Sequence, residues 1–146
     1  LAADLSTSRF ITAIVGILDG AKHQFDYHAP GQGPLLFFRH QTQTHETLSA
    51  STVPLGIVAN APLSTPEPFQ FEPGDFLAVM SDGFFEYANK SGELFGEERV
   101  MDYLKEHQKE SAEKMISGLV ESIQEFAGGA IQGDDMTIFI LKRSGA

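Results

Sequence analysis

The order of strand-like and helical segments constrains the fold of this chain more than any other feature of its sequence. Apolar, strand-like segments recur between residues 10 and 80, two helical segments follow between 96 and 127, and a last strand-like segment lies at 136–141. Strands and helices that are grouped along a chain, and do not alternate, are typical of α+β folds with a mainly antiparallel sheet. We therefore predict one α+β domain of this kind.

Three segments carry the clearest strand patterns. Residues 10–18 are apolar and rich in β-branched side chains, which predicts a strand buried on both faces in the middle of a sheet. The turn dipeptide Asp19-Gly20 and the alternating segment 23–28 follow, so we expect a β-hairpin. Residues 76–80 predict another buried strand, which runs directly into Ser81-Asp82-Gly83.

The helical segments have recognisable ends. The first is expected from Gly96 to about Glu106. The second should begin after Ser111, a good N-cap, and end at Gly128-Gly129, because glycine is common just past a helix C-terminus. Its apolar side chains recur at helical spacing and predict one buried face: Met115, Leu119, Ile123 and Phe126.

Charge and composition exclude several classes of function. The chain has 20 acidic and 10 basic residues, a formal net charge of -10, so it offers no basic surface to nucleic acids or anionic membranes. It has no cysteine, which excludes disulfides, thiolate zinc sites and cysteine nucleophiles. Its longest apolar stretch is too short to span a bilayer, and we expect a cytoplasmic protein.

Aspartates stand beside two of the apolar strands. Asp82 follows the segment 76–80, and Asp134 and Asp135 precede the segment 136–141. If these strands are antiparallel neighbours, the end of one and the start of the other share a sheet edge, and the carboxylates converge there. Crowded carboxylates need a compensating positive charge, and ligand sets made only of oxygen favour Mg²⁺, Mn²⁺ or Ca²⁺ over Zn²⁺. The three aspartates are therefore candidate metal ligands.

The three aspartates also fit a structural role in turns, and the remaining polar residues carry no stronger functional signal. Asp-Gly and Asp-Asp pairs are common in loops, so only their joint placement beside apolar strands favours a metal site.

The histidines show no H-x-H or H-E-x-x-H spacing, and no G-x-S-x-G elbow occurs, so a zinc or serine hydrolase is unsupported. The loop 29–34 contains Gly31 and Gly33, which suit either a tight turn or an approach to a phosphate group.

Six short motifs occur in order along nearly the whole chain, at 9–13, 29–34, 55–56, 76–86, 92–99 and 133–138. Each motif is modest, but the ordered set resembles the bacterial SpoIIE/RsbU branch of the protein phosphatase 2C (PPM) superfamily. The resemblance implies a mainly antiparallel β-sandwich flanked by helices, with a site for two Mg²⁺ or Mn²⁺ ions between the sheets. In that family the aspartate of the Ser-Asp-Gly motif is a metal ligand, which here is Asp82. The first aspartate of the second acidic motif is another, here Asp134, whereas Asp135 occupies a more variable position and is the weaker candidate.

Two departures from the family pattern matter. The first glycine loop usually reads Ala-Gly-His, whereas this chain has Pro30-Gly31-Gln32, so no role of that histidine is transferred. The Gly-Asp and Asp-x-x-Gly-His-Gly motifs that supply the other ligands in the family do not occur here. We therefore expect residues 1–146 to form a single SpoIIE-type phosphatase domain whose N-terminal metal-motif portion is missing, and which is inactive alone.

The resemblance implies an enzyme, a metal-dependent protein serine/threonine phosphatase, that acts on a phosphorylated regulatory partner such as a STAS-type anti-sigma-factor antagonist. Two alternatives stay open. One is a non-catalytic phosphatase-like module for interaction or dimerisation, and the other is an acidic Ca²⁺-binding protein, although no EF-hand spacing is present. Strand edges left open in an incomplete sandwich would also allow a homodimer.

Overall fold

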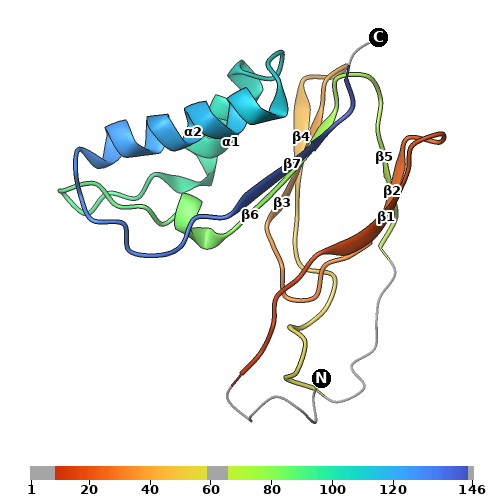
Figure 1. The fold of residues 1–146 in the computed structure, drawn as a ribbon, viewed down its shortest axis with the longest axis horizontal. Helices are drawn as coiled ribbons and strands as arrows, with labels where there is room; N and C mark the ends of the chain where they lie inside the picture. Colours follow the sequence, from red (N-terminus) through yellow and green to blue (C-terminus); the bar gives the residue numbers. More distant parts are fainter. Residues whose placement is uncertain (1–8, 59–65, 145–146) are drawn as a thin grey trace.

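The computed structural model describes residues 9–58 and 66–144, and its strands form two antiparallel sheets (Figure 1). One sheet has the order β1 (Val15–Asp19), β2 (Gln24–His28) and β5 (Phe69–Gln70). The other has the order β4 (Thr44–Leu48), β3 (Leu35–Arg39), β6 (Phe76–Met80) and β7 (Ile138–Lys142). Between β6 and β7 the chain forms the short 3-10 helix η1 (Asp82–Phe84) and the helices α1 (Gly96–Glu106) and α2 (Ala112–Ala127).

The elements pack in three layers, with the four-stranded sheet between the two helices and the three-stranded sheet (Figure 1). Successive side chains of a strand point to opposite faces. Accordingly, Leu36 and Phe38 of β3 belong to the core beneath the helices, whereas Leu35 and Phe37 belong to the core between the sheets. β3 and β6 are therefore the central strands, and the predicted α+β sandwich flanked by helices is confirmed.

β1 differs most from the sequence prediction, which placed residues 10–18 in the middle of a sheet. The strand begins only at Val15, pairs with β2 alone and forms the edge of its sheet. Val15 and Ile17 are 62% and 74% exposed. The prediction was wrong because an apolar, β-branched run favours a strand but does not determine whether that strand is buried. Burial depends on other elements that cover the strand, and the described residues leave the Val15 and Ile17 side chains of β1 exposed. The predicted hairpin with β2 is confirmed.

Both helices begin and end where local signals indicate. α1 spans Gly96–Glu106, as expected. At the start of α2 the Ser111 hydroxyl accepts a hydrogen bond from the Lys114 N–H at 3.3 Å. Gly128 follows α2 with a φ of 57°, the left-handed conformation that glycine adopts without steric cost.

A buried carboxylate, Asp75, joins the turn after β3 to the turn before β6. Its side chain is 1% exposed and accepts hydrogen bonds from the His40 N–H at 2.8 Å and the Glu72 N–H at 3.0 Å. Arg39 Nη1 lies 3.4 Å from the same carboxylate. A buried charge is tolerated only with such partners. Asp75 therefore holds two turns together at the sheet end from which β6 starts.

Asp75→Ala is expected to lower the free energy of unfolding by about 3 kcal/mol, because it removes the buried carboxylate that accepts from the partly buried N–H groups of His40 and Glu72. Urea denaturation followed by circular dichroism measures the change. Asp26→Ala is the control, since Asp26 is exposed and accepts hydrogen bonds only from Gln24 among the described residues. A loss no greater for Asp75→Ala than for the control would contradict the role of this carboxylate.

Candidate metal centre

Asp82 and Asp134 lie in two turns at the same end of the four-stranded sheet, where β6 ends and β7 begins. β6 and β7 are antiparallel neighbours, with Met80 opposite Ile138, so the chain leaves β6 beside the point where it enters β7. The Ser81 N–H donates to the Thr137 carbonyl oxygen at 2.9 Å and extends this pairing toward the acids. The neighbouring strands on which the sequence argument depended are therefore present. That Asp82, Asp134 and Asp135 bind metal stays a prediction.

The two acidic turns touch at Gly83. This buried glycine belongs to η1, and a Cβ atom on it would lie 2.5 Å from the carbonyl oxygen of Asp135 and 3.4 Å from that of Asp134. Any side chain would therefore collide with the backbone of the second turn. The glycine of the Ser-Asp-Gly motif is needed for this close approach, and not only for the turn that follows the strand.

The carboxylates themselves are exposed. Asp134 Oδ1 accepts a hydrogen bond from the Asp135 N–H at 2.7 Å, and Gln132 Nε2 donates to the Asp134 carbonyl oxygen at 2.7 Å, so this turn is held by local contacts. Across residues 9–58 and 66–144, no group of three or more His, Cys, Asp or Glu side chains is arranged to hold a metal ion. Exposed carboxylate oxygens on adjoining turns suit a hard divalent cation, but only as part of its coordination shell.

Two polar side chains that sequence reasoning did not single out lie at the same sheet edge. Ser81 Oγ donates to the Asp135 carbonyl oxygen at 2.9 Å and accepts from the Thr137 N–H at 2.9 Å. Gln32, in the glycine loop before β3, donates from Nε2 to the Met80 carbonyl oxygen at 3.1 Å. The glycine loop 29–34 and both acidic turns therefore meet at the same end of the four-stranded sheet. The only sequence signal for Ser81 was its place beside Asp82.

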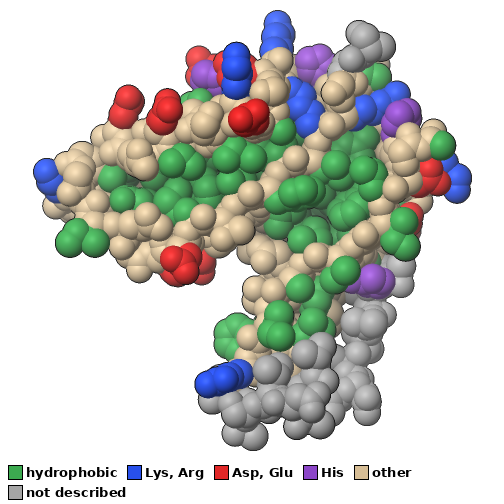
Figure 2. Space-filling view, viewed as in Figure 1, with side chains coloured by type: hydrophobic (Ala, Val, Ile, Leu, Met, Phe, Trp, Pro, Cys, Tyr) green, Lys and Arg blue, Asp and Glu red, His purple; other side chains and the backbone are tan. Residues whose placement is uncertain are grey.

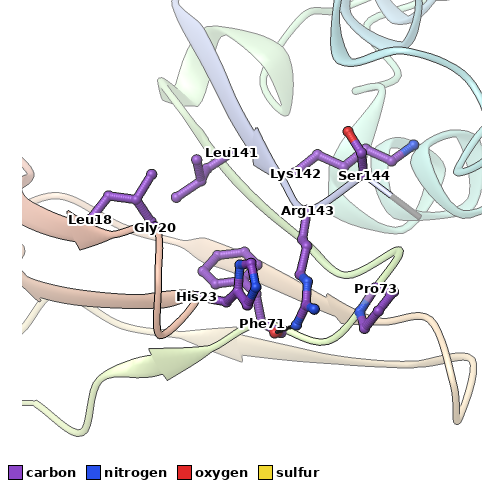
Figure 3. A pocket seen from close by; sticks show the side chains of 9 residues that line it. All are labelled: Leu18, Gly20, His23, Phe71, Pro73, Leu141, Lys142, Arg143 and Ser144. Atoms are coloured by element: carbon purple, nitrogen blue, oxygen red, sulfur yellow. Dashed lines mark hydrogen bonds between the residues drawn. The ribbon is translucent and has the colours of Figure 1, made fainter. Parts of the chain in front are cut away.

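A cavity of about 400 Å³ lies at the other end of the sheets (Figure 3). Leu18 and His23 reach it from the β1–β2 hairpin, and Leu141 and Arg143 from the end of β7. The Arg143 side chain donates to the Phe71 carbonyl oxygen at 2.7 Å. The full length of β7, about 17 Å for a strand of this size, separates the cavity from the acidic turns. The cavity therefore does not belong to the candidate metal centre.

Exposed apolar side chains occur at several places on the surface. Figure 2 shows hydrophobic side chains gathered across the middle of one face, from the helices to the sheets. Large exposed ones include Phe10, Ile11, Val15, Ile17 and Leu18, all in or just before the edge strand β1. No helix in the described part of the chain has the length and apolar character needed to cross a membrane.

The chain matches known proteins in sequence. Residues 1–144 match the family model of Stage II sporulation protein E (SpoIIE). Protein IcfG of Synechocystis sp. is 26% identical over 138 residues, and the match covers 92% of this chain and 21% of that protein. The chain thus spans about a fifth of the length of this curated relative.

Three solved structures have a similar fold. The SiaA-PP2C domain of Pseudomonas aeruginosa matches with a TM-score of 0.73 at 20% identity, over 90% of this chain and 51% of that one. The Mn-presoaked phosphatase domain of SpoIIE from Bacillus subtilis matches with a TM-score of 0.65 at 19% identity, over 91% and 56%. The RsbU and RsbW domains of Rv1364c from Mycobacterium tuberculosis match with a TM-score of 0.70 at 19% identity, over 92% and 37%. Because the family model matches nearly the whole chain, the chain belongs to the Stage II sporulation protein E (SpoIIE) family, and its fold is that of the PP2C-like domains.

Proposed function

We propose that this chain is part of a metal-dependent protein serine/threonine phosphatase domain, in which Asp82 and Asp134 bind divalent cations and Asp135 is a weaker candidate ligand. The observation that supports this most is the direct contact of the two acidic turns across neighbouring strands β6 and β7. When bound, Mg²⁺ or Mn²⁺ ions would lower the pKa of a shared water and stabilise charge on the phosphoryl oxygens. The aspartates hold the cations and are not nucleophiles.

The proposed substrate is a phosphoserine or phosphothreonine side chain of a regulatory partner protein, such as a STAS-type anti-sigma-factor antagonist. The resemblance to the SpoIIE/RsbU branch supports this part of the proposal, since none of the described side chains selects a substrate. A cytoplasmic location belongs to the same proposal. The formal net charge of -10 fits a protein partner better than a nucleic acid, whose phosphates it would repel.

On its own, this chain is expected to hydrolyse p-nitrophenyl phosphate in Mn²⁺ at a rate close to that without protein. The reason is that the described residues bring together fewer acids than a two-metal site needs. Release of p-nitrophenol measures the rate, and Asp82→Asn is the control variant. Robust turnover that disappears in Asp82→Asn would contradict the expected inactivity.

A non-catalytic phosphatase-like module for interaction or dimerisation is the second candidate. The exposed edge strand β1 and the small number of acids at the site favour it. Any sequence encoded upstream of Leu1 discriminates between the two functions. A gene product that also carries the Gly-Asp and Asp-x-x-Gly-His-Gly motifs should be an active phosphatase that Asp82→Asn inactivates. If such a product shows no activity, the module is the better description.

A further inference from the structure

We propose that Ser81 is a positioning residue of the candidate metal centre, because its hydroxyl group fixes the separation of the Asp82 turn and the Asp134 turn. The inference rests on the proposed function, since a positioning role has meaning only if these aspartates bind cations. Ser81 itself acts through the backbone of the second turn and not by contact with a cation.

The hydroxyl of Ser81 makes both of its hydrogen bonds to the opposite turn. It donates to the Asp135 carbonyl oxygen at 2.9 Å and accepts from the Thr137 N–H at 2.9 Å. The Ser81 N–H adds a third bond, to the Thr137 carbonyl oxygen at 2.9 Å. One residue directly before Asp82 thus holds the segment directly after Asp134.

The Asp82 turn is also held from its other side. Gln32 Nε2 donates to the Met80 carbonyl oxygen at 3.1 Å. The glycine loop that carries Gln32 is itself fixed, because the Gly31 N–H donates to the Thr52 carbonyl oxygen at 2.8 Å. The backbone that leads into Asp82 is therefore tied to a supported loop on one side and, through Ser81, to the Asp134 turn on the other.

The separation of the two carboxylates depends on this backbone arrangement. Both aspartates are exposed, and the bond that Asp134 Oδ1 accepts comes from the next residue of its own turn. No described side chain links Asp82 directly to Asp134. Groups that orient metal ligands without touching the metal commonly affect metal affinity by about 10- to 100-fold. The Ser81 hydroxyl occupies the place where such an effect is expected.

The test compares Mn²⁺ binding by the whole chain and by three variants. Ser81→Ala removes the hydroxyl, Ser81→Thr keeps it, and Ser117→Ala removes a hydroxyl from α2 whose bond is to the Lys114 carbonyl oxygen. Paramagnetic broadening of the amide signals of residues 82 and 134 gives the apparent Kd even when binding is weak. We expect about tenfold weaker binding for Ser81→Ala, recovery of most of the affinity in Ser81→Thr, and no change in Ser117→Ala.

Each outcome decides between the hypotheses. If the wild-type chain shows no broadening at these residues, Asp82 and Asp134 do not bind Mn²⁺ in this chain, and the inference fails together with the proposed metal binding. If the wild-type chain binds and Ser81→Ala binds equally well, or lowers only the Tm, the positioning role alone is refuted. Equal weakening in Ser81→Ala and Ser81→Thr would also refute it, because the hydroxyl would then not be the cause. If Ser81→Ala does not fold, Ser81→Cys replaces it, since a thiol is a weak donor and acceptor.

Discussion

Asp82→Asn is expected to weaken Mn²⁺ binding by this chain at least about 100-fold, because a lost ligand should cost more than a lost outer-shell partner. The amide keeps an oxygen near the position of the carboxylate but carries no charge to offset the cation. Asp134→Asn is expected to have a similar effect, since the two turns meet at the same sheet edge. Paramagnetic broadening of the amide signals of residues 82 and 134 by MnCl₂ measures both.

Two further variants complete this test. Asp102→Asn removes an exposed carboxylate from α1, away from the sheet edge, and should leave Mn²⁺ binding unchanged. Asp135→Asn should have a smaller effect than Asp134→Asn, since the family resemblance makes Asp135 the weaker candidate ligand. Mn²⁺ affinity that is the same in Asp82→Asn as in the wild-type chain would remove the basis of the proposed metal centre.

Gly83→Ala is expected to lower the free energy of unfolding by about 3 kcal/mol and to weaken Mn²⁺ binding as well. The added Cβ would lie 2.5 Å from the Asp135 carbonyl oxygen, and a backbone atom cannot rotate away as a side chain can. The second turn must therefore move away from Asp82. Thermal unfolding and the Mn²⁺ titration measure the two effects on the same protein.

Gly133→Ala is the matched control for this prediction. It lies directly before Asp134, but a Cβ atom on it would meet nothing within 4 Å, and its backbone does not require glycine. The same chemical change in the same acidic segment should therefore leave both stability and Mn²⁺ affinity nearly unchanged. If the two variants behave alike, the contact between the turns does not position the acids.

The helices could be predicted from the sequence because their signals are local. Ser111 and Gly128 act on the residues next to them. Apolar spacing identifies Met115, Leu119 and Ile123 on the buried face of α2, whereas the predicted Phe126 is only partly buried and Ala127 is buried beside it. The position of β1 could not be predicted in this way. A strand pattern shows that residues can pair with another strand, but not whether another element covers their side chains. In the described part of the chain, the side chains of Val15 and Ile17 are exposed to solvent.

The candidate site was predictable only in part for the same reason. Asp82 and Asp134 could be chosen because each adjoins an apolar strand, and pairing of β6 with β7 was a condition that the structure meets. Ser81 and Gln32 could not be identified as residues of the site, because their hydrogen-bond partners Thr137 and Met80 lie 56 and 48 positions away in the sequence. Nothing in the local pattern around Gln32 indicates a contact with the end of β6.

The long sequence separation of β6 and β7 also has a consequence for the folding pathway. Both helices lie between these strands, and the bonded residues Ser81 and Thr137 are 56 positions apart. Helices form early from local contacts, whereas closing a loop of this length costs on the order of 3 kcal/mol of chain entropy. β7 should therefore join the sheet after α1 and α2 have formed. Until β7 pairs with β6, the Asp82 turn has no second acidic turn beside it.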